Sequence, residues 1–446
     1  MIRTLLRALG LVYFIAFVSF GTQAAGLIGS HGILPFGDYL KEARVSLGAA
    51  AYWEVPSVLW ARGSDGALTA VWVLGASCAL VAIAGYRLRI ALAACLVLWL
   101  SLCSVGQDFL SYQWDVLLLE AGFLAIFADD SPARVWLFRW LIFRLMFFSG
   151  AGKLLTGDPT WRNLTALHFH YETQPLPTPV AWYLDQLPLW FQKISTAFVL
   201  AAEEAVPFLF FAPRRLRQAG AGITILLQLL ILIAGNYTFF NFLTILLALF
   251  LLVETKRASQ SRTHRIVSAG LVTFVGVTSA LLFLELFRVD LPRGGAAILR
   301  GIAPMKIVNS YGLFTVMTVR RPEIVVEGSQ DGETWRAYEF PYKPGNVMRA
   351  PPVVAPLQPR LDWQMWFAAL GTRQENPWFT NFMIRLLEGE PSVLRLLSYN
   401  PFPTAPPQYI RARIFLYHFT HFGERAWWRR EEEGTYFPVV SLKQAQ

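Results

Sequence analysis

Long apolar runs constrain the fold of this chain more than any other feature of its sequence. Five stretches of membrane length contain no charged residue, and four more contain one to three. A bilayer core of about 30 Å requires about 20 apolar residues in a helix, so each stretch is a candidate span. The nine predicted spans are residues 5–26, 66–86, 90–107, 109–128, 135–155, 195–212, 219–235, 237–253 and 266–284.

The distribution of lysine and arginine predicts the orientation of these spans, because cytoplasmic connections carry an excess of both residues. With a cytoplasmic N-terminus, the outer segments hold only Lys41, Arg44, Arg62, Arg162 and Lys193. The inner segments hold Arg3, Arg7, Arg87, Arg89, Arg134, Arg214, Arg215, Arg217, Lys256, Arg257, Arg262 and Arg265. An odd number of spans then places the residues after about 289 on the outer side, in a periplasm or an endoplasmic reticulum lumen.

The charge content divides the chain into two predicted domains. Residues 1–288 form a transmembrane helical domain with two long outer loops, 27–65 and 156–193, and residues 305–446 form an extracytoplasmic domain. In the second domain, strands are predicted at residues 315–319, 323–327, 335–340 and 409–416, and helices at residues 361–370, 379–387 and 424–433. Residues 330–333 provide a hairpin turn. The predicted fold is a polytopic α-helical membrane bundle of about nine spans, followed by a soluble α+β or β-sandwich domain.

Composition excludes several classes of function. The net charge is +9, but the basic residues form short clusters between apolar runs, so no nucleic-acid partner is predicted. All three cysteines, Cys78, Cys95 and Cys103, lie in apolar runs, so the outer domain can form no disulfide of its own. No Gly-rich phosphate loop, G-x-S-x-G or H-E-x-x-H sequence occurs, and no cofactor is predicted. The predicted partners are membrane lipids.

Charged residues inside the predicted spans are candidate functional residues. Asp115 and Glu120 diverge by about 140° around a helix, so they cannot form a carboxylate dyad on one face. Glu120 lies at about the same depth as Arg144 on the next, antiparallel span, measured from the short connection near residue 131. A buried Glu120–Arg144 ion pair that holds two helices in register is the favoured interpretation. A role in substrate binding is the alternative.

Lys153 ends a predicted span, directly after the small residues 149–152. A lysine at the membrane boundary usually extends its amine to water, and this is the favoured interpretation. The alternative is a catalytic base. A lysine desolvated against small residues has a lowered pKa and can accept a proton near neutral pH.

Two further groups of polar residues are candidate sites. His168 and His170 would point the same way in an extended segment, as metal ligands can, but only Glu172 is near enough to be a third ligand. No metal site is therefore predicted. Glu203 and Glu204 are adjacent helical positions, which diverge by about 100°, so at most one of them faces a given partner.

Arg360 and Asp362 flank Leu361 at the start of the predicted helix 361–370. The two charged residues either cap this helix or contact the membrane domain, and a structural role is favoured over a role in binding. The helix also carries the large aromatic residues Trp363 and Trp366.

Six stretches of the sequence match one known family. The hallmark is YQWDVLLLEAGFL at residues 112–124, which contains Trp114, Asp115 and Glu120. The other stretches are residues 26–35, 167–177, 235–241, 326–329 with 331–332, and 359–370. In all six the chain resembles the lipase maturation factors. The resemblance implies exported client proteins as partners, and it adds Trp114 and His170 to the candidates for structural or client-contact roles. Trp363 and Trp366 are then candidates for contact with an incompletely folded client, because exposed apolar surface is what a chaperone recognises.

The resemblance implies an endoplasmic reticulum membrane protein that helps newly made homodimeric lipases fold and assemble. Its C-terminal domain would lie in the lumen. This chain is short, rich in arginine relative to lysine, and carries no cysteine in its outer part. These features favour a bacterial member, in which the membrane is the inner membrane.

A shorter resemblance supports a different function. The segment from Arg144 to Leu154, followed by Trp161, is similar to part of the vitamin K-dependent carboxylases, in which a lysine at the matching place acts as a base. Lys153 is the only residue of this chain to which the resemblance assigns a role. The prediction is a maturation factor without catalytic activity, and the alternative is an intramembrane enzyme of the carboxylase type that uses Lys153 as its base.

Overall fold

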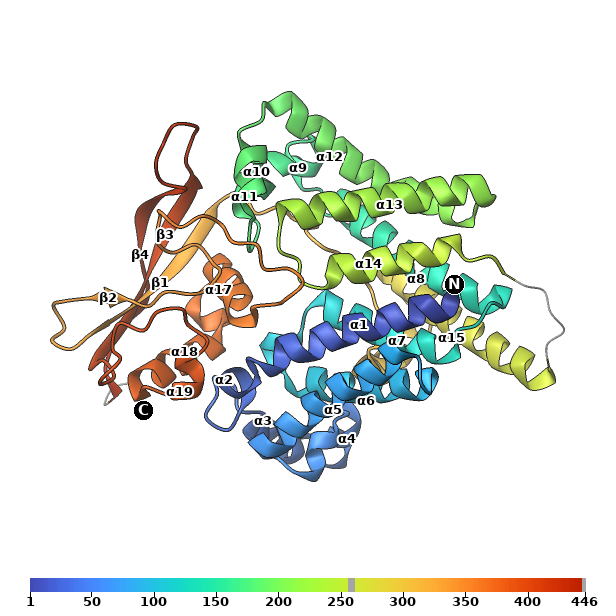
Figure 1. Ribbon diagram of the computed structural model, residues 1–446, viewed down its shortest axis with the longest axis horizontal. Helices are drawn as coiled ribbons and strands as arrows, with labels where there is room; N and C mark the ends of the chain where they lie inside the picture. The colour runs from blue at the N-terminus through green and yellow to red at the C-terminus, as the bar shows by residue number, and fades with distance from the viewer. Residues whose placement is uncertain (256–260, 443–446) are drawn as a thin grey trace.

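The computed structural model describes residues 1–255 and 261–442. It contains a large helical bundle that is capped at one end by a four-stranded antiparallel sheet with its own helices (Figure 1). This architecture confirms the predicted fold class. Lys256 and Arg257, two residues of the predicted inner segments, lie outside the described residues, as do residues 443–446 of the predicted outer domain.

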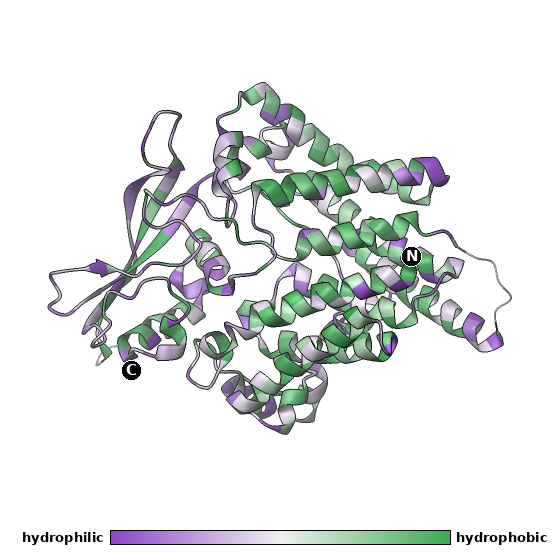
Figure 2. Cartoon of the chain, in the orientation of Figure 1, coloured by the Kyte–Doolittle hydropathy of each residue, from purple (hydrophilic) through white to green (hydrophobic). Residues whose placement is uncertain are grey.

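Seven helices within the described residues are long and apolar enough to cross a membrane. They are α1 (Ile2–Gly21), α5 (Asp65–Ala84), α6 (Leu88–Val105), α8 (Pro132–Leu155), α12 with the 3₁₀ turn η4 (Leu189–Phe211), α13 (Arg214–Ala234) and α15 (Arg262–Leu286). Figure 2 shows a mainly hydrophobic bundle beside a mainly hydrophilic sheet. The chain is therefore an integral membrane protein.

The other two predicted spans form shorter helices than expected. Helix α7 (Gln113–Phe127) has 15 residues, and α14 (Phe240–Leu249) has 10 before it continues into η5 (Phe250–Leu252). Helix α7 packs against α6 and α8, and α14 packs against α1, α8 and α13. Non-helical backbone at membrane depth is tolerated where protein surrounds it, so these inner helices need not match the bilayer thickness.

Short helices connect the long ones and form the loops beside the sheet. Those of the bundle are α2 (Ala24–Ile28), α3 (Phe36–Leu47), η1 (Gly48–Ala50), α4 (Ala51–Glu54), η2 (Val58–Ala61), η3 (Gln107–Leu110), α9 (Pro159–Arg162), α10 (Ala166–Thr173), α11 (Pro179–Asp185), α16 (Gly295–Ile302) and η6 (Ala303–Met305). Those of the sheet domain are α17 (Arg360–Leu370), η7 (Arg373–Glu375), α18 (Pro377–Glu388) and α19 (Pro391–Leu394). Helices α17 and α18 confirm the two amphipathic helices predicted there.

The sheet has the strand order β2-β1-β3-β4, and all neighbouring strands are antiparallel. Its strands are β1 (Arg321–Ser329), β2 (Arg336–Ala337), β3 (Tyr409–Phe419) and β4 (Trp428–Val440). The predicted turn joins β1 to β2: Asp331 Oδ1 accepts hydrogen bonds from the amides of Glu333 and Thr334, and Gly332 has a φ of 80°. A residue without a side chain adopts this left-handed conformation at little cost.

The prediction of a charged helix at residues 424–433 is wrong, because most of this segment belongs to strand β4. Its backbone pairs with β3 from Phe419↔Trp428 to Ile410↔Val440. Local helix propensity is weak compared with the ladder of hydrogen bonds that β3 offers. The run Arg429 to Glu433 therefore lies on the edge of the sheet, where charged side chains oppose pairing with a second chain.

The prediction of a strand at residues 315–319 is also wrong, because side chains of the bundle bind this backbone instead of a neighbouring strand. The hydroxyl of Thr156 donates to the Thr315 carbonyl at 2.8 Å. The Met317 amide donates to Asp158 Oδ2 at 2.6 Å. The segment follows the surface of the bundle and so contributes to its contact with the sheet domain.

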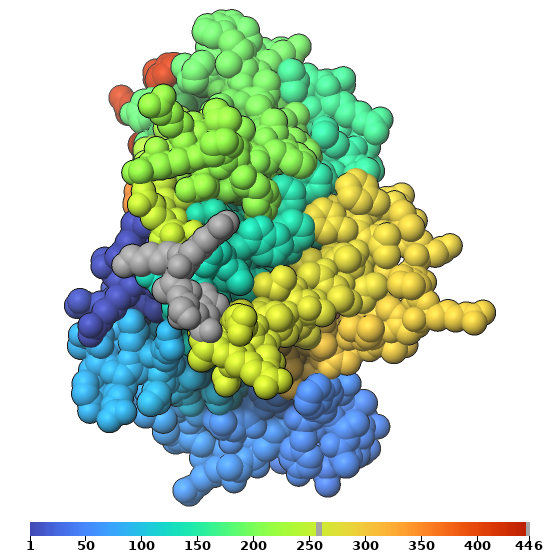
Figure 3. Space-filling view, turned by 90° about the vertical axis from the view of Figure 1, so that its right-hand side faces the viewer, coloured from blue at the N-terminus to red at the C-terminus, as the bar shows by residue number. Residues whose placement is uncertain are grey.

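A large hydrophobic core extends from the bundle into the sheet domain. The ring of Phe109, between α6 and α7, lies 5.7 Å from that of Trp378 in α18, measured between centroids. Seen from the opposite end of the bundle, the helices hide the sheet domain almost completely (Figure 3). The sheet domain thus packs directly on one end of the bundle.

Candidate functional site

Arg360, at the start of α17, forms a buried ion pair with Asp115 in the first turn of α7. Arg360 Nη1 and Nη2 each lie 2.9 Å from one carboxylate oxygen of Asp115, and the Phe109 carbonyl accepts a further hydrogen bond from Nη1. Arg360 therefore contacts the membrane part, which is one of the two predicted alternatives, and it does not cap its own helix. We call the contact between bundle and sheet domain around this pair the junction.

Three tryptophans also lie at the junction, Trp114 on α7 and Trp363 and Trp366 on α17. Trp114 Nε1 donates to Gln358 Oε1 at 2.8 Å, and its ring centroid lies 4.9 Å from that of Trp363. Trp366 Nε1 donates to the carbonyl of Thr173 in α10 at 2.9 Å. Trp363 and Trp366 are only 2% and 4% exposed. The structure therefore offers no surface at these two side chains for the client contact that the sequence suggested.

Asp362 forms hydrogen bonds within the sheet domain. Its Oδ1 accepts hydrogen bonds of 2.8 Å from the amides of Tyr342 and Lys343, and the side chain is buried. Burial raises the pKa of Asp362 to about 6, although the two amides and the charges of Lys343 and Arg349 favour the ionised carboxylate. Asp362 thus holds a loop of the sheet domain on α17, whereas Arg360 reaches the bundle.

Glu120 and Arg144 form the buried ion pair between α7 and α8 that the depth of the two residues predicted. Three more donors bind Glu120 Oε2: the Tyr311 hydroxyl at 2.7 Å, the Asn309 amide at 3.0 Å and Asn309 Nδ2 at 3.1 Å. Arg144 Nη1 donates to the Asn309 carbonyl at 2.8 Å. The pair therefore also binds the segment that leads from the bundle to the sheet domain.

Arg321 is a junction residue that the sequence analysis missed. It begins β1, is fully buried, and donates to Glu323 Oε1 at 2.8 Å. It also donates to the carbonyls of Glu172 in the last turn of α10 and of Gln174 and Pro175 in the loop that follows. Glu172 in turn accepts a hydrogen bond from the Phe419 amide of β3 at 2.7 Å. The alternation of charge in Arg-Pro-Glu at the start of a buried strand is the signal that would have identified Arg321.

Lys153 does not extend to water, so the favoured interpretation of this residue is wrong. Its Nζ donates to Glu203 Oε2 at 2.7 Å, to the Leu313 carbonyl at 2.9 Å and to the Ser149 carbonyl at 3.3 Å. Three acceptors thus use all three protons of the ammonium group. Glu203 on α12 provides the charge that compensates burial, and Glu204 does not take part in the pair, as the divergence of adjacent helical positions predicted.

His168 and His170 lie in helix α10, so they do not point the same way as an extended segment would require. Within residues 1–255 and 261–442, no three His, Cys, Asp or Glu side chains are grouped as metal ligands. His170 Nε2 lies 3.0 Å from the Tyr237 hydroxyl. Burial and the charge of Lys153 lower the pKa of His170 to about 4, so its imidazole is neutral at physiological pH.

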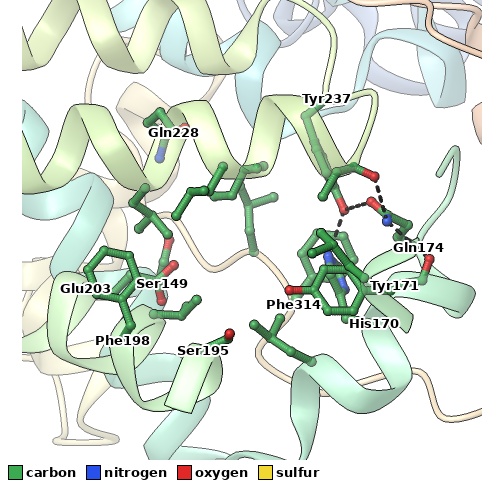
Figure 4. Close-up of a pocket in the computed structure, with 18 of the residues that line it drawn as sticks. Ser149, His170, Tyr171, Gln174, Ser195, Phe198, Glu203, Gln228, Tyr237 and Phe314 are labelled. Atoms are coloured by element: carbon green, nitrogen blue, oxygen red, sulfur yellow. Dashed lines mark hydrogen bonds between the residues drawn. The ribbon is translucent and has the colours of Figure 1, made fainter. Parts of the chain in front are cut away.

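A cavity of about 500 Å³ lies between α8, α12 and α13, beside α10 and α11. Most of its wall is aliphatic and aromatic, with residues such as Leu145, Phe198, Leu227 and Phe314. The polar residues at its wall are Ser149, Lys153, His170, Tyr171, Gln174, Ser195, Glu203, Gln228 and Tyr237, many of which are labelled in Figure 4. An apolar cavity of this size with a few polar groups is typical of a site for a small molecule.

Comparison with known proteins gives the same family over both parts of the chain. The lipase maturation factor transmembrane domain matches residues 1–259, and the lipase maturation factor C-terminal domain matches residues 307–438. Lipase maturation factor 2 of Gallus gallus is 37% identical in an alignment that is 583 positions long with its gaps and covers 98% of this chain and 81% of the relative. Lipase maturation factor 1 of Bos taurus is 34% identical in an alignment that is 496 positions long with its gaps and covers 98% of this chain and 88% of the relative.

Lipase maturation factor 2 of Homo sapiens is 36% identical and covers the same 98% of the chain. No solved structure matches. The relatives are vertebrate proteins, so the bacterial origin predicted from length and composition is not borne out. Nothing in these similarities supports the carboxylase-type alternative. By both its domains and its relatives, the chain belongs to the lipase maturation factor family.

Proposed function

We propose that this protein assists the folding or assembly of exported lipases, as a membrane-embedded maturation factor without catalytic activity. The observation that carries this proposal is the similarity to lipase maturation factors over 98% of the chain, through the bundle and the sheet domain alike. The bonding of Lys153 supports the absence of catalysis, because a cation with three acceptors is not available as a base.

We assign a structural role to the buried residues at and around the junction. They are Trp114, Asp115, Glu120, Arg144, Arg360, Asp362, Trp363 and Trp366. Burial and close bonding support this assignment, since a residue that binds a client directly must be exposed before the client arrives. In this proposal, the junction keeps the sheet domain in a fixed position on the bundle. We further propose that the two domains divide between residues 288 and 305.

We also propose that the N-terminus lies in the cytoplasm and the sheet domain on the outer or lumenal side of an endoplasmic reticulum membrane. Both predicted outer loops contact the sheet domain, which supports a location of the loops and the sheet domain on the same side of the membrane. Arg385 Nε donates to the Gly32 carbonyl at 3.0 Å, and Glu172 accepts from Phe419. A reporter fused after Gln446 should be active on the outer side and one fused after Arg217 in the cytoplasm. The reverse pattern would reject this orientation.

An exposed group of aromatic side chains is the best candidate for the client surface. Tyr183 in α11 and Phe422 in the β3–β4 loop are 51% and 66% exposed, and their ring centroids lie 6.2 Å apart. Trp182 supports both rings and donates to the Thr420 hydroxyl at 3.2 Å. Exposed aromatic residues at a rigid position are enriched among residues that dominate protein interfaces. We name Trp182, Tyr183 and Phe422 the aromatic patch.

Replacing both exposed members of the aromatic patch by serine should lower the yield of active lipase by about fivefold or more, because an interface residue of this kind contributes more than about 1 kcal/mol. The measurement is lipase activity secreted by cells that lack their own maturation factor and express Tyr183→Ser/Phe422→Ser. Tyr399→Ser is the matched control, since Tyr399 is equally exposed but lies away from the patch. An equal loss in both variants, or no loss in either, would contradict this assignment of the client surface.

A further inference from the structure

The cavity between α8, α12 and α13 opens toward the region that the bilayer occupies. Three residues of its wall, Ile194 on α12 and Leu230 and Ile233 on α13, are also 61%, 47% and 52% exposed at the outer surface of the bundle. Both helices belong to the candidate membrane spans. The rim of the cavity is therefore apolar and lies on helices that face the membrane. A ligand that enters between α12 and α13 thus comes from the lipid phase and not from water.

The charges at the cavity wall cancel each other. Lys153 and Glu203 form an ion pair at 2.7 Å, and His170 is neutral at physiological pH because burial and Lys153 lower its pKa to about 4. The ammonium group of Lys153 has no proton left for a ligand, since Glu203 and two backbone carbonyls accept all three. A phosphate or carboxylate headgroup would be desolvated here without a cation to pair with, which disfavours anionic lipids.

Uncharged groups at the wall remain available for hydrogen bonds. The hydroxyls of Tyr171 and Ser195 point into the cavity (Figure 4), and neither has a hydrogen-bond partner within the described part of the chain. Gln228 uses its Oε1 to accept from Asn241 Nδ2 at 2.9 Å, and its amide nitrogen points toward the cavity in the same view. The site thus offers two hydroxyls and one amide donor.

These donors and acceptors match one class of membrane lipid. A free hydroxyl on a ligand can both donate to and accept from Tyr171 or Ser195, and an ester carbonyl can accept from the Gln228 amide. The apolar wall accommodates an acyl chain, for which burial is favourable in proportion to its area. We propose that the cavity binds a neutral lipid of the diacylglycerol type, which enters laterally between α12 and α13 with its hydroxyl and ester groups at Tyr171, Ser195 and Gln228.

Photocrosslinking to the purified full chain tests the proposal directly. Three probes carry the same photoreactive acyl chain: a diacylglycerol, a phosphatidic acid and a free fatty acid. The diacylglycerol should label peptides of α12 and α13 at the cavity wall at least several-fold more strongly than either anionic probe. Equal labelling by all three, stronger labelling by an anionic probe, or labelling confined to other helices would overturn the assignment.

Two variants and one control link the labelling to the cavity. Ser195→Trp fills the cavity and should reduce labelling by about tenfold or more, whereas Ala201→Trp, an exposed position of the same helix outside the cavity wall, should leave it unchanged. Tyr171→Phe keeps the ring and removes one hydrogen bond, which should weaken binding roughly three- to tenfold. Full labelling of Ser195→Trp, at normal abundance and monodispersity, would reject the site.

The readout separates this proposal from the maturation function. Labelling needs no client, so the variants of the aromatic patch should still be labelled by diacylglycerol even when they lose lipase maturation. That result would link the aromatic patch to the client and not to the lipid. Conversely, lipase maturation that stays normal while diacylglycerol fails to label the cavity would reject the lipid site and leave the maturation function standing.

Discussion

Arg360→Leu is expected to destabilise the protein by about 3–5 kcal/mol, because it leaves the carboxylate of Asp115 buried without its partner. Asp115 receives both guanidinium hydrogen bonds of the pair at 2.9 Å, and neither side chain has access to water. The junction should loosen first, since the pair joins α7 to α17. A lower midpoint of thermal unfolding in detergent, together with faster proteolytic separation of the sheet domain, would be the measured result.

The double variant Asp115→Leu/Arg360→Leu distinguishes an unpaired charge from a loss of packing. Removing both charges should restore most of the lost stability, because a buried ion pair is often replaceable by apolar residues of similar size. Arg214→Leu provides the control: its ion pair with Glu254 at 2.8 Å is exposed at both side chains, so its loss should cost far less stability than the loss of Arg360. If the double variant were as unstable as Arg360→Leu, the buried charge of Asp115 would not be the cause.

Glu120→Leu is expected to have a comparably large effect, also about 3–5 kcal/mol, since it leaves Arg144 buried without a counter-charge. It also removes the acceptor for the hydroxyl of Tyr311 and for the amide and side chain of Asn309. The loss should therefore appear both within the bundle and in the segment that leads to the sheet domain. Hydrogen exchange of the Asn309 amide, together with the thermal midpoint, measures both effects.

Glu120→Gln provides the graded control for this prediction. The amide keeps one acceptor oxygen for the donors around it but lacks the negative charge that Arg144 requires, so its destabilisation should fall between those of the native residue and Glu120→Leu. Glu120→Leu/Arg144→Leu should recover part of the stability. A Glu120→Leu variant with native stability would show that the pair contributes nothing measurable to the fold.

Local and short-range features of the fold were predictable from the sequence. Apolar runs of membrane length predicted the helical bundle, because a bilayer imposes a minimum length on a helix that crosses it. The Glu120–Arg144 pair followed from counting residues in two antiparallel helices on either side of a short connection. Strands β1 and β3 and helices α17 and α18 followed from alternation and helical periodicity. In each case the interacting residue lies nearby in the sequence, or the pattern of apolar residues is enough to indicate the element.

The candidate site, in contrast, depends on contacts between distant segments. Arg360 lies 245 residues from Asp115, and no local pattern indicates which of the buried charges it binds. Lys153 was expected at the water boundary, but α12 brings Glu203 next to it, and the ion pair makes burial possible. The tryptophans Trp363 and Trp366 resemble an exposed apolar surface in sequence and are covered in the structure by the end of the bundle.

Residues 428–440 and the cavity show why some features follow from the sequence and others only from the tertiary structure. The charged run from Arg429 to Glu433 has a local preference for a helix worth only a few tenths of a kcal/mol per residue, and pairing with β3 outweighs it. The cavity exists because three helices and two loop helices meet without filling the space between them. The sequence alone determined which segments enter the membrane, since that depends on composition and length. Only the tertiary structure decided which charges pair, which aromatic residues are buried and where a ligand fits, because these depend on how distant segments pack.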